Sequence, residues 1–280
     1  MSERAVAEQY ERADLLSRIL AALAASGRDT TRLRTDDLAT VDAFHTGGRA
    51  ATAMVLGEMS LEAGMRVLDA GCGIGGTARC LAADHGCIVT GIDLAASFVI
   101  AASELTRLAG LAEACRFAVA SAGRLPFADR SFDAVLCIHV AMNIPDRAGL
   151  VAEFARVLRP GGELCLFDVT RSSAQPLPFP LPWAETAATC FLLGAEETRQ
   201  TLELAGLRVL SSRSLRDFAI GFFDRQLQRT APDPSMPGIH LLTGANTRDK
   251  MRNYREALAA GDLDPVIMVA QAPPGEPAEG

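Results

Sequence analysis

The chain has 280 residues, 49% of them hydrophobic and 22% charged, which suits one large domain with insertions better than two separate cores. A net charge of −7 argues against nucleic acid as the main partner, because phosphate binding needs a basic surface. No apolar run approaches the roughly 20 residues of a membrane span, and the seven cysteines include no C-x-x-C pair, so we expect neither a membrane span nor a metal site. The odd number of cysteines and the missing signal-peptide pattern favour a cytoplasmic location.

Residues 1–60 are expected to form an N-terminal helical cap. Apolar side chains recur at helical spacing over residues 3–25 and predict one amphipathic helix, and a second helix is expected over residues 50–59 after a stretch rich in glycine, threonine and aspartate. Between the two helices lies the turn-like segment Phe44-His45-Thr46-Gly47-Gly48. If the cap folds over a pocket, His45 is a candidate catalytic residue, and the alternative is an ordinary loop histidine.

From residue 61 onward, strands and helices alternate. Apolar strand-like runs lie at 66–69, 88–93, 116–120, 132–139 and 163–169, and helical stretches at 76–84, 95–109 and 150–158 separate them. This alternation predicts a doubly wound α/β domain with a mostly parallel sheet, whose core is residues 61–170. The run Arg159-Pro160-Gly161-Gly162 is a turn signal before the fifth strand.

Insertions are expected in residues 171–272, together with the last two strands of the same domain. Residues 175–183 contain four prolines and can form neither a helix nor a central strand, so we expect a loop that acts as a lid. A helix over 195–205, a strand over 207–215, a mixed helical insertion to about residue 260 and a strand over 265–270 follow. Residues 273–280, rich in proline, glycine and glutamate, should form a disordered tail.

The segment 67–76 (VLDAGCGIGG) is the most informative in the chain. A strand ends in glycines that open directly into a helix, where a ligand can approach the backbone closely. The pattern G-x-G-x-x-G also fits a dinucleotide site, so two interpretations remain open from the glycines alone. Asp69 favours one of them, because a carboxylate two residues before Gly71 would repel a pyrophosphate but attract a cationic ammonium or sulfonium group.

Taken together, these segments resemble the class I S-adenosylmethionine-dependent methyltransferases. Residues 69–76, followed by Gly91-Ile92-Asp93, resemble the family's first motif and its ribose-binding acid. Residues 125–127 and 132–135 resemble its loop into the fourth strand, and residues 153–162 resemble its helix and turn before the fifth. Phe44–Gly48 and Pro182-Trp183-Ala184 further resemble the sarcosine/dimethylglycine and tocopherol methyltransferase branch, which includes N-, O- and C-methylating enzymes.

The resemblance implies a seven-stranded sheet with an antiparallel last strand and S-adenosyl-L-methionine as cofactor. Where the family usually has an acid that accepts from the adenine amino group, this chain has Ser121, whose hydroxyl is a weaker acceptor. The expected cofactor-binding residues are Asp69, Gly71, Cys72, Gly73, Gly75, Asp93, Leu94, Ser121, Ala122 and His139.

Methyl transfer mainly requires alignment and exclusion of water, and a base only when the nucleophile arrives protonated. His139 follows the fourth strand at the same edge as Asp69 and Asp93, and an imidazole that titrates near neutrality would suit a base. The alternative is that His139 packs against the cofactor. Asn143 could orient a substrate, although a helix cap is the favoured interpretation.

The expected substrate is a small, partly apolar molecule, because aromatic side chains gather in the inserted segments. Arg213, Arg216, Arg225 and Arg229 could bind an anionic group, but solvated helix faces explain them equally well. A homodimer is one open candidate for the oligomeric state. Two rival functions remain: a nicotinamide-dependent oxidoreductase that uses the same glycines, and a methyltransferase-like protein without turnover.

Overall fold

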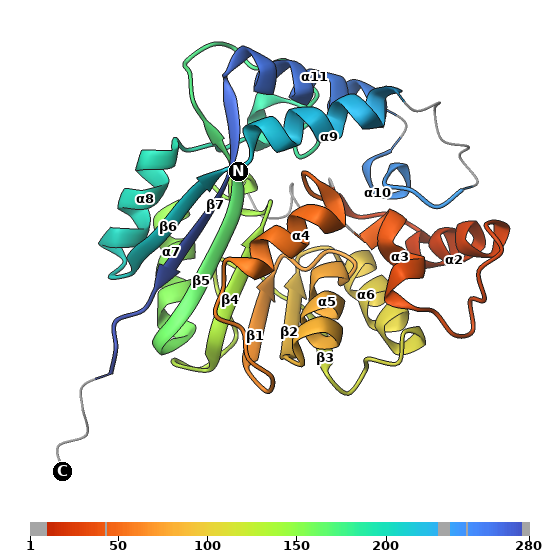
Figure 1. Cartoon of the computed structure of the whole chain (residues 1–280), viewed down its shortest axis with the longest axis horizontal. Helices are drawn as coiled ribbons and strands as arrows, with labels where there is room; N and C mark the ends of the chain where they lie inside the picture. Colours follow the sequence, from red (N-terminus) through yellow and green to blue (C-terminus); the bar gives the residue numbers. More distant parts are fainter. Residues whose placement is uncertain (1–9, 43, 229–235, 245, 276–280) are drawn as a thin grey trace.

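A computed structural model of the chain describes residues 10–42, 44–228, 236–244 and 246–275. Its centre is one seven-stranded sheet in the order β3-β2-β1-β4-β5-β7-β6 (Figure 1). The strands are β1 Arg66–Ala70, β2 Ile88–Asp93, β3 Cys115–Val119, β4 Phe132–Ile138, β5 Leu158–Arg171, β6 Arg208–Ser214 and β7 Leu263–Gln271. Only β7 runs antiparallel to its neighbours, so the predicted doubly wound, mostly parallel sheet with an antiparallel last strand is confirmed.

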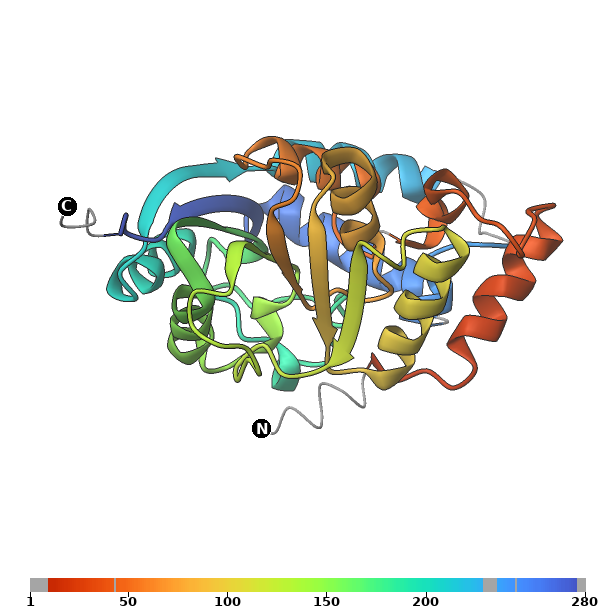
Figure 2. The same ribbon diagram turned by 90° about the horizontal axis from the view of Figure 1, so that it is seen from below.

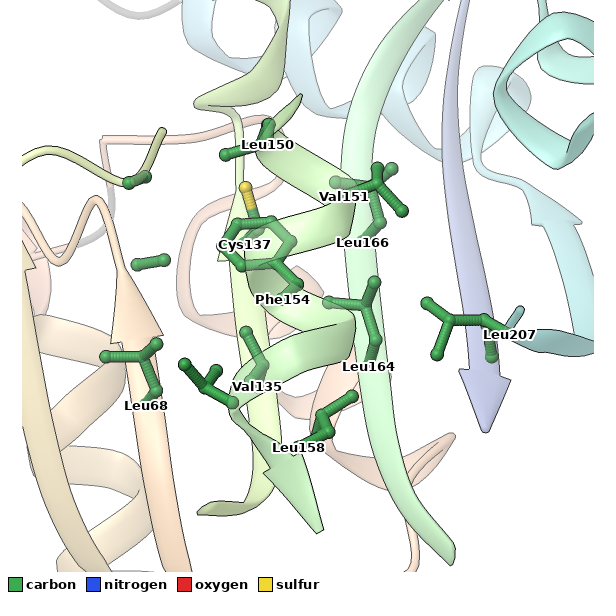
Figure 3. Close-up of a cluster of buried hydrophobic side chains, with 14 of the residues drawn as sticks. Leu68, Val135, Cys137, Leu150, Val151, Phe154, Leu158, Leu164, Leu166 and Leu207 are labelled. Carbon is green, nitrogen blue, oxygen red and sulfur yellow. The ribbon is translucent and has the colours of Figure 1, made fainter. Parts of the chain in front are cut away.

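Helices cover both faces of this sheet (Figure 2). The helices α4 (Gly48–Gly57) and α5 (Gly76–His85) pack on one face, and α7 (Arg147–Val157) and α8 (Ala195–Leu204) pack on the other. Each face carries one cluster of buried apolar side chains: the first cluster lies under α4 and α5, and the second under α7 and α8. The side chains of β1 alternate between them, with Val67 in the first cluster and Leu68 in the second. Figure 3 shows the second cluster, with Phe154 of α7 buried against β4 and β5. Because α4 packs on the sheet face, it contributes to the core even though it lies in the range expected to form the cap.

The N-terminal region differs from the single predicted helix. The helix α2 begins at Leu15 and ends at Ala25. Asp14, directly before it, has a φ of 56° and breaks the helical pattern there. Residues 1–9 lie outside the described residues. A further helix, α3 (Thr35–Asp42), was not predicted; it buries Leu38 and Val41, and Asp36 and Asp37 in its first turn suit the helix dipole.

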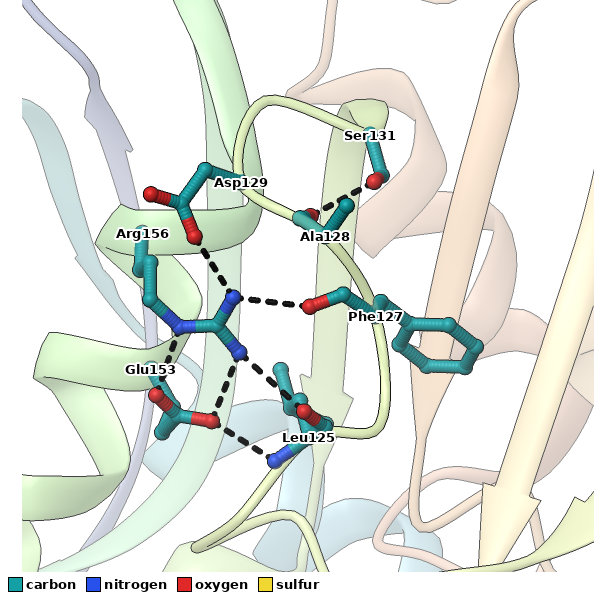
Figure 4. A network of polar contacts seen from close by, with 7 residues as sticks. All are labelled: Leu125, Phe127, Ala128, Asp129, Ser131, Glu153 and Arg156. Carbon is teal, nitrogen blue, oxygen red and sulfur yellow. Dashed lines mark hydrogen bonds and ion pairs between the residues drawn. The ribbon is translucent and has the colours of Figure 1, made fainter.

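The loop between β3 and β4 is held by one arginine of α7 (Figure 4). The Arg156 guanidinium donates to the carbonyl oxygens of Leu125 and Phe127 and pairs with Asp129 and Glu153, at distances of 2.7 to 3.1 Å. Glu153 also accepts from the Leu125 amide at 2.7 Å. Residues 125–127 and 153–162, the two segments that resemble parts of the methyltransferase family, are therefore hydrogen-bonded to each other. The predicted turn at 159–162 appears as an irregularity inside β5, which pairs with β4 at Leu158 and again from Glu163.

The insertions after β5 lie beyond one end of the sheet, where Figure 1 shows α9 (Arg216–Gln228) and α11 (Thr247–Ala260) side by side. They enclose Trp183, Phe223 and Tyr254, and the Trp183 and Tyr254 rings meet edge to face at 5.1 Å. The short helix α10 (His240–Thr243) packs with α2 and with α6 (Ala96–Leu108).

We call residues 175–191 the proline loop; within it Leu181 and Ala184 form an isolated bridge. Residues 276–280 of the expected tail lie outside the described residues, and none of the described helices is long and apolar enough to cross a membrane.

Candidate active site

Two cavities adjoin at the carboxyl ends of the parallel strands. The smaller cavity, of about 290 Å³, is bordered by the ends of β1, β2 and β4, including Asp69, Asp93 and Ile138. The larger cavity, of about 870 Å³, lies among α9, α10, α11 and the proline loop, and its wall includes Trp183 and Tyr254. Four side chains line both cavities, so the two spaces meet there: Tyr10, Phe44, His45 and His139.

The glycine-rich loop forms one wall of the smaller cavity. The amides of Gly71 and Cys72 donate to the carbonyl oxygen of Ile92 at 2.8 and 2.9 Å, which fixes the loop to β2. Gly71 has a φ of 82°, and a Cβ there would collide with Val140. Gly71, Cys72 and Gly73 line the cavity as expected. Gly75 does not: its φ of 83° turns the chain into α5, where a Cβ would press on Phe117.

Asp69 is a buried carboxylate at the edge of the smaller cavity. Its side chain is 2% exposed, and its Oδ2 atom has no hydrogen-bond partner among the described residues. Burial, with a further contribution from the charge of Asp93, raises the pKa of Asp69 to about 7. A cation bound in this cavity would offset the cost of burying the charge. The site therefore fits a ligand with a positive group.

Asp93 presents a second carboxylate to the same cavity. Its Oδ2 accepts from the Gly73 amide and its Oδ1 from the Ala95 amide, both at 2.9 Å. Burial raises the pKa of Asp93 despite these hydrogen bonds. Each oxygen keeps a second lone pair, so the rigidly held carboxylate can still accept from neighbouring hydroxyl groups. The other expected contact residues, Leu94, Ser121 and Ala122, line the same cavity.

His139 stands where the two cavities meet. Its backbone has a φ of 55°, its ring lies 4.8 Å from the Phe167 ring, and its Nε2 has no partner within the part of the chain that the structure describes. Burial first, and then His45, hold the pKa of His139 well below its usual value. The ring is therefore neutral at physiological pH. Burial therefore favours the uncharged ring over the charged one in the protein without ligands.

His45 adjoins His139, with 6.0 Å between the ring centres. Its Nδ1 lies 3.3 Å from the Thr46 carbonyl oxygen, and its Nε2 lies 3.0 Å from Thr52 Oγ1. The carbonyl can only accept, so Nδ1 carries the proton and Nε2 accepts from the threonine hydroxyl. Burial lowers the pKa of His45 to about 4. Both ring nitrogens are engaged, which suits a fixed wall residue.

Asn143 and Tyr10 join three distant parts of the chain above the smaller cavity. The Asn143 amide donates to the carbonyl oxygens of Trp183 and Thr189 at 3.0 and 2.8 Å, and its Oδ1 accepts from the Tyr10 hydroxyl at 3.0 Å. The favoured interpretation, a cap of the next turn, does not describe this side chain, which bonds to distant residues, while Asp146 is the N-cap residue of α7. Sequence reasoning did not single out Tyr10, since its partners lie more than 130 residues away.

Of the four arginines considered for an anionic group, the three that the structure describes do not line either cavity. Arg213 pairs with Glu58 at 2.7 Å, and Arg216 pairs with Asp264 at 3.5 Å. Arg225 is not part of either cavity wall, and Arg229 lies outside the described residues. His240 does line the larger cavity. Within the described ranges, no group of three His, Cys, Asp or Glu side chains is arranged to hold a metal ion.

Comparisons with known proteins agree with this geometry. Residues 68–166 match a family model described as a methyltransferase domain. Methyltransferase GfsG of Streptomyces halstedii is 36% identical over 133 residues, which are 48% of this chain and 48% of that protein, so the match spans about half of that relative. O-methyltransferase resE of Aspergillus sclerotiorum is 32% identical over 183 residues, which are 65% of this chain and 69% of that protein. The fold is similar to the crystal structure of the [4+2]-cyclase SpnF, with a TM-score of 0.70, 22% identity and coverage of 98% of each chain.

Proposed function

Because the chain belongs to the class I S-adenosylmethionine-dependent methyltransferases, we propose that it transfers a methyl group to an O, N or C atom of a small, partly apolar molecule. The observation that carries the proposal is the buried Asp69 carboxylate, with one oxygen lacking a described partner, in a cavity that meets a larger, aromatic-lined cavity at His139. The smaller cavity would hold the cofactor and the larger one the acceptor. A volume of about 870 Å³ lies within the range of small-molecule sites.

The residues of the smaller cavity match the parts of S-adenosylmethionine. Asp69 would hold the α-ammonium group, Asp93 the ribose hydroxyls, and Ser121 and Ala122 the adenine. When bound, the cofactor supplies an electrophilic methyl group on a positively charged sulfur. In ordinary dinucleotide sites a pyrophosphate lies against the glycine loop, and the Asp69 charge would oppose that group. This argues against the nicotinamide alternative.

His139 would act as the proton acceptor when the acceptor atom is a hydroxyl or a protonated amine. Its neutral ring and its Nε2 without a described partner are the two properties that this role needs. The low pKa is compatible with the role, because the acceptor proton becomes strongly acidic as the new bond to the methyl carbon forms. His45, with both nitrogens engaged, would hold the His139 ring in position rather than take the proton itself.

Calorimetry with S-adenosylmethionine and with NAD tests the proposal. We expect one-site binding of the former, no binding of the latter, and at least a tenfold weaker affinity in Asp69→Ala, about 1.4 kcal/mol. Asp133→Asn is the matched control, because Asp133 lies on β4 and pairs with Arg159 outside both cavities. A folded protein that binds NAD but not S-adenosylmethionine would refute the proposal.

A methyl-labelled cofactor then separates an enzyme from a methyltransferase-like protein without methyl transfer. We expect label to appear in a partly apolar alcohol, phenol or amine from an acceptor panel. Cofactor binding without label transfer to any acceptor would favour a use of the fold other than methylation, as in the cyclase that it resembles.

A further inference from the structure

Two hydroxyl groups from distant parts of the chain meet in the wall of the larger cavity. Thr46 Oγ1 lies 3.1 Å from the Tyr254 hydroxyl oxygen, although the two residues are 208 positions apart. Both residues line the cavity, and both are almost fully buried, with 3% and 1% of their surfaces exposed. We call them the hydroxyl pair. The Tyr254 ring packs edge to face on Trp183 and Phe223, both at 5.1 Å, so the pair is a polar point among aromatic side chains.

The hydroxyl pair has one more hydrogen than its own hydrogen bond uses. Each hydroxyl group has one hydrogen to donate, and either of the two can be the donor in the bond between them. The hydroxyl that accepts therefore keeps its own hydrogen. Among the described residues no acceptor meets this hydrogen, since neither side-chain oxygen makes a second hydrogen bond. His45 does not serve, because its Nε2 already accepts from Thr52 Oγ1 at 3.0 Å.

The pair stays uncharged at physiological pH and remains a donor. Burial raises the pKa of the Tyr254 hydroxyl, and the opposing effect of its hydrogen bond with Thr46 is smaller. The described wall of the larger cavity contains no aspartate or glutamate that could accept the remaining hydrogen. A buried donor without an acceptor is destabilising, so the wall suits a ligand that supplies an acceptor.

The hydroxyl pair lies on the side of the larger cavity that adjoins the smaller one. Thr46 directly follows His45 in the chain, and consecutive Cα atoms are about 3.8 Å apart. His45 lines both cavities, and its ring centre is 6.0 Å from that of His139. Met142, which packs in the same apolar cluster as Tyr254, lies shortly after His139 in the chain. A ligand group bound at the pair is therefore close to the junction of the two cavities.

A carbonyl group is the ligand group that best completes this arrangement. A carbonyl oxygen accepts and brings no hydrogen, whereas a ligand hydroxyl would bring another donor that itself needs an acceptor. A charged oxygen would be costly to bury beside the Trp183 and Phe223 rings. We propose, building on the proposed function, that the methyl acceptor is a carbonyl compound whose oxygen accepts a hydrogen bond from the pair of Thr46 and Tyr254. The atom to be methylated lies near this carbonyl group, at His139.

A matched pair of fluorescent probes tests the carbonyl preference without knowledge of the substrate. The ketone prodan and its propyl analogue, in which a methylene group replaces the carbonyl, share one dimethylaminonaphthalene skeleton. With S-adenosylhomocysteine present at saturation, we expect the ketone to bind about fivefold more tightly than the analogue, the effect of one neutral hydrogen bond. Prodan emits at longer wavelength when its carbonyl oxygen accepts a hydrogen bond, so the emission of the bound ketone reports the contact directly.

The double variant Thr46→Val/Tyr254→Phe removes both hydroxyls, because either one alone could donate to the ligand. Removal of both partners of a buried hydrogen bond by groups of the same shape is close to neutral for stability. We expect the fivefold preference to disappear, the emission of bound prodan to move to shorter wavelength, and binding of the propyl analogue not to weaken. Thr198→Val is the control: Thr198 is a buried threonine of α8 that donates to the Gly194 carbonyl oxygen and lines neither cavity. It should leave preference and emission unchanged.

A second pair repeats the comparison in turnover. With a methyl-labelled cofactor, acetylnaphthol should have a KM about fivefold lower than ethylnaphthol in the wild type, and the two values should become equal in the double variant. Absence of a ketone preference in both pairs, or a preference that survives in a folded double variant, overturns the proposal. Thermal unfolding verifies that each variant is folded. The probes are also titrated without S-adenosylhomocysteine, so failure of cofactor binding, which concerns the proposed function, is distinguishable from failure of the carbonyl preference.

Discussion

Replacing Asp69 by asparagine should have opposite effects on cofactor affinity and on stability. The carboxyl of Asp69 has a pKa of about 7 in the protein without ligands, against an ordinary value of 3.8. A cationic ammonium group favours the ionised form, so binding at lower pH must first remove a proton. The ionised fraction falls about tenfold between about pH 8 and about pH 6, and the affinity of the wild-type protein should fall with it.

The stability effect has the opposite sign. Because the folded-state pKa is raised, ionisation of the buried carboxyl adds no cost to the free energy of folding below the unfolded pKa of 3.8, and this cost grows as pH rises towards 7. Each pKa unit corresponds to about 1.4 kcal/mol, so the cost approaches about 4 kcal/mol at and above neutrality as an upper bound. Asp69→Asn should therefore raise the melting temperature of the ligand-free protein more at about pH 8 than at about pH 5.

Two measurements check this reasoning. Calorimetry across the pH range should show pH-dependent S-adenosylmethionine affinity in the wild type, and weak affinity with little pH dependence in Asp69→Asn. Thermal unfolding of the two proteins should show a stabilisation that grows with pH. Wild-type affinity that is constant over this range, or a variant that is less stable at high pH, would refute the assignment of a buried, cation-binding carboxylate.

Three further perturbations probe the rest of the site. Asp93→Asn should weaken S-adenosylmethionine binding by about tenfold, because one acceptor becomes a donor; equal affinity in calorimetry would remove Asp93 from the ribose site. His139→Ala should lower kcat by about 10² for an alcohol or phenol and leave cofactor affinity unchanged. The wild-type pH–rate profile should have its acidic limb well below pH 6.5, since the pKa of His139 is lowered, and an identical limb in the variant would exclude the base. Asn143→Ala should speed hydrogen exchange across residues 181–191 but not in β4, and unchanged exchange would show that Asn143 does not fasten the proline loop.

The sheet could be predicted because its information is local. The buried strands β1, β2 and β4 are short, largely apolar runs, and the helices α5, α6 and α7 each begin soon after the strand that precedes them. The glycine-rich loop could also be predicted, because Gly71 and Gly73 adopt positive φ, a backbone conformation that favours glycine. The position of Asp69 and Asp93 beside one cavity could be predicted because both lie at the carboxyl ends of neighbouring strands.

Features that depend on distant contacts could not be predicted. The helix α3 has only Leu38 and Val41 to mark its buried side, too little periodicity for a prediction. The role of Asn143 depends on carbonyl oxygens about 40 residues away, and its position near a helix start favoured a cap instead. The burial of His139 at the junction of two cavities, which lowers its pKa, has no local sequence pattern.

The two cavity walls come from different parts of the chain. In the smaller cavity, the carboxylates of Asp69 and Asp93 lie at the ends of β1 and β2, where the sheet determines their position. Arg18 and Arg248 of the larger cavity lie on α2 and α11, helices before the first strand and after the sixth; α2 packs on α6 and α10, and α11 packs on α9 and β7. Changes in these helices would alter the wall of the larger cavity without moving the strand ends that border the smaller one. Of the two interpretations left open for Arg213 and Arg216, surface ion pairs agree with the structure, since Arg213 pairs with Glu58 and Arg216 with Asp264.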